Sequence, residues 1–292
     1  MIELVLLGLL LLLGFTVELT YRFAGALPLE SISDDAWSAT QSGIVTLVAF
    51  IIGFSFAQAS ERFDARRVLI VKEANAIGTT WLRADNLPSG ASGTFRRVLA
   101  EYTTTRLSMY EVPVGSAPYT TALGQSGREQ SQLWPIARAA LHAHRGDLGL
   151  SLLMQSLNDT IDVSAEQIAA LTNHVPAATT AITIFLTWLA AFSLGIRFAR
   201  SKSRPLLMSA LTVITYSLVI TMIIDYDRPQ SGFIKVSLAP LATQLQSMRK
   251  EQLGKGGDII PIAMDQKDGE RMSRSVLPSG DTRRRRTHPS PR

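Results

Sequence analysis

AWSATQSGIVTLVAFIIGFSFAQAS, residues 36–60, is a stretch of the chain without a single charged side chain. An α-helix rises about 1.5 Å per residue, so this stretch is long enough to cross the roughly 30 Å hydrocarbon core of a bilayer. Charge-free runs at residues 174–196 and 205–224 are also long enough, and the run at 4–17 becomes so when its flanking residues are added. The chain, with 46% hydrophobic residues, is therefore predicted to be an all-α integral membrane protein with four transmembrane helices.

The four apolar runs arrange the chain as two hairpins around a polar insert. We expect a first transmembrane hairpin at residues 1–58, a helical polar insert at 59–175 and a second transmembrane hairpin at 176–224. A membrane-proximal segment at 225–253 and a disordered basic tail at 254–292 follow. Because each hairpin returns the chain to the side that it left, the N-terminus, the insert and the C-terminal segment are expected on one side of the membrane. The two hairpin connections are expected together on the other side.

The basic residues do not determine the orientation of the chain in the membrane, because they occur on both sides of the predicted spans. They occur in the second connection, at residues 197–204, and on the insert side, at 62–72 and 283–286, while the first connection is acidic at 30–35. We expect a cytoplasmic insert and cytoplasmic termini in the cell inner membrane, because a large cysteine-free domain and a basic tail are more easily retained than translocated. The first run begins Met-Ile-Glu instead of with positive charges, which favours a retained span over a cleaved signal peptide.

The insert is predicted to be helical. Phe63, Ile70, Ala74, Ile77 and Trp81 recur at helical spacing and lie along one stripe. The second span and this stripe form either one continuous helix of about 60 Å or two helices with a break near residue 58. Further helices are expected at residues 94–110, 129–144, 150–173 and 241–249, with a loop rich in glycine, proline and serine between the first two.

The sequence predicts no enzyme, no cofactor and no metal site. It has no phosphate-binding glycine loop, no nucleophile elbow, and no histidine pair at the spacing that binds zinc on a helix. Asp225 and Asp227 are expected at a solvated helix end, with Tyr226 at the membrane interface. The net charge of +5 owes much to the arginine run at 283–286, which we interpret as a solvated tail, with anionic lipid as the alternative partner and no role in nucleic-acid binding.

One face of the second span carries Thr46, Phe50 and Phe54, which are four residues apart, and Gly53. Two interpretations are open. The face packs against lipid or other helices, as most aromatic residues in spans do. Alternatively, several copies around an axis bring the phenylalanine rings together as a hydrophobic constriction, which can gate ions by dewetting.

Several short motifs are similar to known membrane proteins. FIIGF at residues 50–54, followed by ERFDAR at 61–66, resembles the second transmembrane helix of bestrophins and its cytosolic continuation, with a one-residue gap. EANAIGT at 73–79 and DYDRP at 225–229 are similar to a bacterial membrane family with a bestrophin-like domain. This second resemblance extends over roughly residues 40–250.

The resemblance implies a fold and a set of residue roles. Bestrophins are pentameric anion channels with four membrane helices per subunit, cytosolic termini and a helical cytosolic domain that encloses the pore. By position, the resemblance assigns Thr46, Phe50 and Phe54 to the pore neck, although the family tends to be apolar at the first. The cytosolic end of the pore helix then holds three charged residues, Arg62, Asp64 and Arg66. No acidic cluster resembles the family's calcium clasp, so calcium activation is not transferred.

We therefore predict a bestrophin-like homo-oligomer, a pentamer by resemblance, that passes anions such as chloride passively through a hydrophobic neck. Basic side chains at the cytosolic end would raise the local anion concentration. Its partners would be the lipid bilayer, further copies of itself and inorganic anions. The alternative is a membrane-anchored scaffold or signalling protein whose helical insert binds a partner without conduction.

Overall fold

The computed structural model describes residues 2–24, 33–201, 205–228 and 232–255. Residues 1–250 form one compact unit, which is the unit described below. Within the described ranges the chain is helical and has no strand. Most of the basic tail predicted at 254–292 lies outside these ranges, but its first two residues belong to the last helix. The elements are α1 (Ile2–Phe23), α2 (Asp34–Arg83), the 3-10 turn η2 (Ala84–Asn86), α3 (Ser89–Tyr110), α4 (Ala117–Ala143), α5 (Leu148–Thr172), α6 (Ala177–Arg200), α7 (Leu206–Asp227) and α8 (Ala239–Lys255).

Four helical segments among the described residues are long and apolar enough to cross a membrane, which confirms the four predicted spans. They contain α1, α2, α6 and α7, and α1 begins two residues before the apolar run that predicted it. Along α1 the charged residues are Glu3 and Glu18, which lie near its two ends, and Arg22 in its last turn.

The second span and the apolar stripe form one continuous helix. α2 runs for 50 residues without a break at residue 58, which corresponds to a length of about 75 Å. It begins where the Ser33 hydroxyl accepts a hydrogen bond from the backbone N–H of Ala36. In its second half the predicted stripe is buried at Ile70, Ala74, Ile77 and Trp81. The continuous-helix alternative is therefore the correct one.

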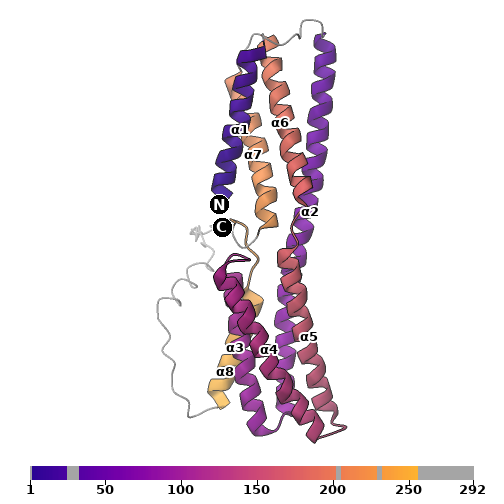
Figure 1. Cartoon of the computed structure of the whole chain (residues 1–292), viewed down its shortest axis with the longest axis vertical. Helices are drawn as coiled ribbons and strands as arrows, with labels where there is room; N and C mark the ends of the chain where they lie inside the picture. The colour runs from indigo at the N-terminus through magenta and orange to yellow at the C-terminus, as the bar shows by residue number, and fades with distance from the viewer. Residues whose placement is uncertain (1, 25–32, 202–204, 229–231, 256–292) are drawn as a thin grey trace, which may run out of the picture. The chain divides into compact units, whose positions relative to one another are not determined.

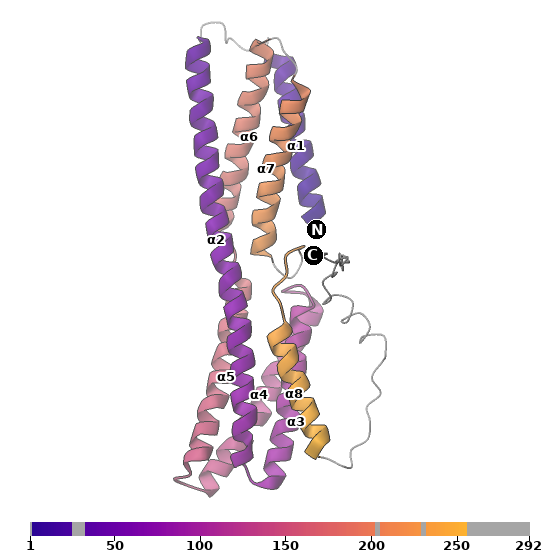
Figure 2. The ribbon, with the colours of Figure 1, turned by 180° about the vertical axis from the view of Figure 1, so that it is seen from behind.

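The four spans do not pack in the order of the chain. α1 packs on α6 and α7, and α2 also packs on α6 and α7, so these two helices lie between α1 and α2 (Figures 1 and 2). Within the described residues α1 and α2 make no contact with each other. One side of α2 is thus covered by α6 and α7, and no membrane helix of the same subunit covers its opposite side.

The end of α6 lies beside the beginning of α2. Arg200, in the last turn of α6, donates from Nη2 to Asp34 Oδ1 at 2.6 Å, and Arg197 Nη1 donates to Gln41 Oε1 at 2.9 Å. These bonds join the end of α6 to the beginning of α2. The expected charged residues Glu30, Lys202 and Arg204 lie outside the described residues.

The insert forms a helical bundle around the C-terminal half of α2. α5 packs along α2, α4 packs against α3 and α5, and α8 adds Leu241 and Met248 to the same core (Figures 1 and 2). The centre of this core is made of large apolar side chains that are fully or almost fully buried, including Trp81, Phe95 and Leu133.

The loop predicted before residue 129 is wrong in part, because α4 begins at Ala117. The Ser116 hydroxyl accepts a hydrogen bond from the Tyr119 N–H, and Pro118 occupies the first turn, where its missing N–H costs nothing. Gly124 and Gly127 lie inside the helix. In this segment the proline lies in the first turn of a helix and the glycines lie within that helix, so they do not indicate a long loop.

The close contact of α1 with α6 depends on Gly195. A Cβ atom built on Gly195 would lie 2.7 Å from the Val17 carbonyl oxygen and 2.8 Å from the Thr20 Cβ. We expect Gly195→Ala to push the two helices apart and to destabilise the protein by about 1–3 kcal/mol. The thermal unfolding temperature of the detergent-solubilised protein should fall by several degrees.

Gly8→Ala on α1 is the matched control, because a Cβ atom there meets nothing within 4 Å. Equal unfolding temperatures for the two variants would contradict the tight α1–α6 contact.

Candidate functional site

The side of α2 that α6 and α7 leave open is the candidate site. In the most apolar 18-residue stretch of each span, 17% of the residues are buried within the subunit for α2, compared with 28% for α1, 39% for the segment that contains α6 and 28% for α7. The exposed residues recur every three or four positions along nearly the whole helix. We call this surface the uncovered face; it consists of Thr46, Phe50, Gly53, Phe54, Ala57, Glu61, Asp64, Val68, Val71, Lys72, Asn75, Thr79 and Leu82.

The membrane part of the uncovered face differs from the exposed sides of the other spans. α1 and α7 expose bulky apolar side chains, such as Leu4, Leu11, Leu206 and Leu211, which suit contact with lipid tails. α2 also exposes Val45 and Leu47, but beside its two phenylalanines it exposes six small or hydroxyl residues: Ser42, Gly43, Thr46, Ala49, Gly53 and Ala57. Small residues allow other helices to approach closely, so this side of α2 suits contact with protein or a pore better than contact with lipid.

The three residues predicted for the neck all lie on the uncovered face. The Phe50 side chain is 69% exposed and that of Phe54 49% exposed, and their Cα atoms are one helical turn apart. The Thr46 hydroxyl donates to the Ser42 carbonyl oxygen at 2.8 Å, so its hydrogen bond is made within α2. Thr46 therefore needs no partner from outside the helix and can present its methyl group to the neighbouring phenylalanine turn.

The structure separates the three charged residues predicted at the cytosolic end of the pore helix. Asp64 is exposed on the uncovered face. Arg62 is half-buried, and its Nη1 donates to the Gln58 carbonyl oxygen at 3.2 Å. Arg66 is 1% exposed and points to the opposite side, into the subunit. Only Asp64 of these three shares a face with Phe50 and Phe54.

Arg66 joins the middle of α2 to the ends of α5 and α7, a role that sequence reasoning missed. Its Nε donates to the Ala170 carbonyl oxygen at 3.0 Å and its Nη2 to that of Asn173 at 2.9 Å, both at the end of α5. Its Nη1 donates to the Asp227 carbonyl oxygen at 3.0 Å, at the end of α7. Burial lowers the pKa of the Arg66 guanidinium, while the nearby Asp227 carboxylate opposes that shift. We call this arrangement the Arg66 clasp; its sequence signal is that Arg66 falls four residues before Ile70, on the buried side.

The acidic residues at the end of α7 also belong to this junction, so the predicted solvated helix end is wrong. Asp225 accepts hydrogen bonds from the backbone N–H groups of Phe233 and Ile234, at 2.9 and 3.0 Å. Asp227 Oδ1 accepts from the Val175 N–H at 2.8 Å, in the break between α5 and α6. Both aspartates are buried, and both accept hydrogen bonds from backbone N–H groups that lie outside the helices.

Tyr226, between these aspartates, packs against α2. Its ring centroid lies 5.6 Å from that of Phe56 and 5.2 Å from that of Phe63. Gly232 is held close to the same junction, because a Cβ atom built on it would overlap the Asp225 carboxylate. The end of α7 is thus fixed to α2 by aromatic contacts as well as by the Arg66 clasp.

A buried ion pair fixes α3 to α2 further along. Arg106 Nε donates to Glu73 Oε1, and the Tyr110 hydroxyl donates to Glu73 Oε2 at 2.8 Å. Burial alone would lower the pKa of Arg106, but the Glu73 carboxylate raises it above its usual value. Burial and Glu73 together raise the pKa of Tyr110 well above its usual value. This network holds the bundle on α2 and does not reach the uncovered face.

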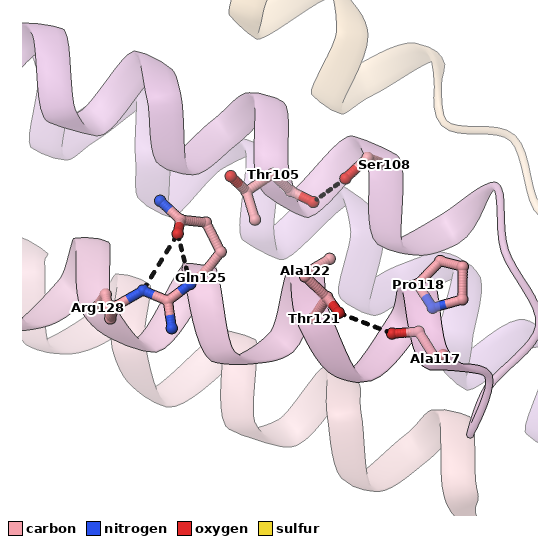
Figure 3. Close-up of a pocket in the computed structure, with 8 residues that line it drawn as sticks. All are labelled: Thr105, Ser108, Ala117, Pro118, Thr121, Ala122, Gln125 and Arg128. Atoms are coloured by element: carbon pink, nitrogen blue, oxygen red, sulfur yellow. Dashed lines mark hydrogen bonds between the residues drawn. The ribbon is translucent and has the colours of Figure 1, made fainter.

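A hollow of about 540 Å³ lies between α3 and α4 (Figure 3). Two of its polar side chains are held by their own helices: Gln125 Oε1 accepts from Arg128 Nη2 at 2.6 Å, and the Ser108 hydroxyl donates to the Thr105 carbonyl oxygen. Glu129, beside it, accepts from Thr105 and Gln125, and burial raises its pKa. Figure 3 shows the Ser108 and Thr121 hydroxyls bonded within their own helices.

The Arg66 clasp can be tested against its sequence neighbour. Arg66→Met leaves the carbonyl oxygens of Ala170, Asn173 and Asp227 without the donors described above, and we expect it to cost about 3 kcal/mol or more. Arg67 is exposed, so Arg67→Met should change the stability by no more than about 0.5 kcal/mol. Chemical unfolding of the detergent-solubilised protein measures both, and equal losses would argue against the clasp.

Comparison with known proteins gives a consistent result. The family model for the Bestrophin-like domain matches residues 10–241. A bacterial bestrophin homologue from Klebsiella pneumoniae, solved by Zn-SAD phasing, has a TM-score of 0.62 at 16% identity and covers 89% of this chain and 100% of its own. A variant of the homologue from the same organism has a TM-score of 0.64 at 16% identity, with 85% and 98% covered.

A further crystal structure, described as a variant of a membrane protein, has a TM-score of 0.64 at 16% identity and covers 89% of this chain and 99% of its own. At this level of identity the structures show a shared fold. A search of curated proteins gives no match. Since the family model covers most of the chain, including all of α2, α3, α4 and α5, the chain is a membrane protein that belongs to the bestrophin-like family.

Proposed function

We propose that several copies of this chain surround an axis and form a passive ion channel whose pore is lined by the uncovered face of α2. The observation that carries the proposal is the one-sided burial of α2. Its span is the least covered of the four. Its open side bears two phenylalanines and Leu47 among small residues, whereas α1 and α7 expose mainly bulky aliphatic side chains. In a ring of copies this side of α2 would face the central pore and not the lipid.

In such a ring Phe50 and Phe54 form the neck, the narrowest part of the pore. Each copy contributes two phenylalanine rings, one helical turn apart, to an apolar constriction. Water leaves such a constriction easily, and ions cannot pass while it is dry. Residues 36–60 carry no ionisable side chain, so the span offers no proton relay or voltage sensor. Ions would therefore move down their own gradient.

The remaining assignments follow from family membership. Five copies per channel and chloride as a permeant ion are the expectations taken from bestrophins. We assign the channel to the cell inner membrane with the helical bundle and both termini in the cytoplasm. The N-terminal end of α1, the C-terminal end of α7 and the bundle lie at the same end of the spans, as this assignment requires (Figure 1).

The non-conducting scaffold is less well supported. A scaffold has no need for an open pore helix, and it would be expected to bury the side with Thr46, Phe50 and Phe54 against its own helices. In the described residues that side is exposed. The exposure of this face therefore favours the channel.

Ion flux into liposomes tests the proposal. Purified protein should carry chloride or a monovalent cation down its gradient, and Phe50→Ala and Phe54→Ala should each raise that flux roughly several-fold, because a wider and wetter neck lowers the barrier. The matched control is Phe15→Ala on α1, where the phenylalanine is 65% exposed on the side that we assign to lipid.

Oligomers must be verified for every variant by size-exclusion chromatography with light scattering. If verified wild-type oligomers carry no ion, the channel proposal is wrong. If flux occurs but Phe50→Ala and Phe54→Ala behave as Phe15→Ala does, the neck lies elsewhere.

A further inference from the structure

The charges just beyond the neck determine which sign of ion the proposed pore favours. Glu61 and Asp64 lie seven and ten residues after Phe54, which places them about 10 and 15 Å further along α2. A helix turns by about 100° per residue, so both lie within about 40° of Phe50 around the helix axis. Both carboxylates are exposed, and neither forms an ion pair with a described residue.

The neighbouring arginines do not share this position. Arg62 lies about 120° from Phe50 around the axis, and Arg66 about 160°. The first is half-buried on the Gln58 carbonyl oxygen, and the second is buried in the clasp. Residues 61–66 hold two acidic and two basic side chains, so their net charge is zero in the sequence. In the structure the negative charges face outward on the uncovered face and the positive charges turn away from it.

More distant basic residues do not restore the balance at the neck. Arg67 is exposed but lies about 100° from Phe50, at the edge of the uncovered face. Lys72 is on the face but 18 residues beyond Phe54, about 27 Å away, which exceeds the Debye length of about 8 Å at physiological salt several-fold. On the other side of the neck the nearest charge towards this face is that of exposed Asp35. From Thr46 to Asp64 the uncovered face therefore carries no positive charge.

If the proposed function is correct, each copy in the ring contributes one Glu61 and one Asp64 to the wall just inside the neck. Rings of acidic side chains select cations, and a narrow path through low-dielectric walls concentrates their field. We infer that the pore prefers monovalent cations to anions, with Glu61 and Asp64 as the residues that determine this preference. This inferred cation preference differs from the anion preference of bestrophins. The reason is that the resemblance placed Arg62 and Arg66 at the pore, whereas the structure turns both away from the uncovered face.

Reversal potentials test the inference on the full-length protein in planar lipid bilayers. With a tenfold KCl gradient, the wild-type permeability ratio of K⁺ to Cl⁻ should be at least about five. The double variant E61Q/D64N should bring that ratio close to one while current persists, because the neck is unchanged. Each single variant should give an intermediate ratio, which keeps the test informative if the double variant does not assemble.

The matched control removes the same charge from another helix. Asp159→Asn with Glu166→Gln neutralises two exposed carboxylates, seven residues apart on α5, and should leave the permeability ratio at its wild-type value. A wild-type preference for chloride, or a ratio that E61Q/D64N changes no more than the control does, would overturn this inference while the channel itself stands. Absence of any current in verified oligomers would instead overturn the proposed function, and this inference with it.

Discussion

The one-sided packing of α2 is the constraint on which the rest of this structure depends. A helix can cross the hydrocarbon region alone because it satisfies its own backbone hydrogen bonds, and α2 uses that freedom to continue for 50 residues from the membrane into the bundle. α6 and α7 cover one side of its first half, and α5 covers one side of its second half. Every feature of the candidate pore follows from the side that remains open.

The junction between the membrane helices and the bundle is held by groups that satisfy helix ends. The end of α5, the start of α6 and the end of α7 all leave backbone groups without helical partners. Arg66 and Asp227 supply partners at these helix ends, and Asp225 supplies them to Phe233 and Ile234 in the segment after α7. Charged side chains are therefore buried in a region that sequence patterns assign to solvent. Using Arg66 in this way also removes a positive charge from the open side of α2.

The sequence predicted the spans and the apolar stripe of α2 well, because both depend on local periodicity. For the same reason it predicted that Phe50 and Phe54 lie on one side of α2. It did not predict that α1 and α2 would lie apart, since the pairing of helices depends on contacts such as Gly195 with Val17 that no spacing reveals. Nor did the sequence predict that the side chains of Asp225, Asp227 and Arg66 are buried. A charged residue looks the same in sequence whether its side chain faces water or a backbone group.

The unbroken course of α2 makes it a mechanical lever. The Arg66 clasp bonds this lever to the ends of α5 and α7, beside the break at residues 173–176 that separates α5 from α6. Phe50 lies 16 residues from Arg66, a distance of about 24 Å along the axis. A tilt of about 5° around the clasp would therefore displace the Phe50 ring by about 2 Å, comparable with the radius of a small ion. Forces on the bundle could thus reach the membrane half of α2 through rigidity alone.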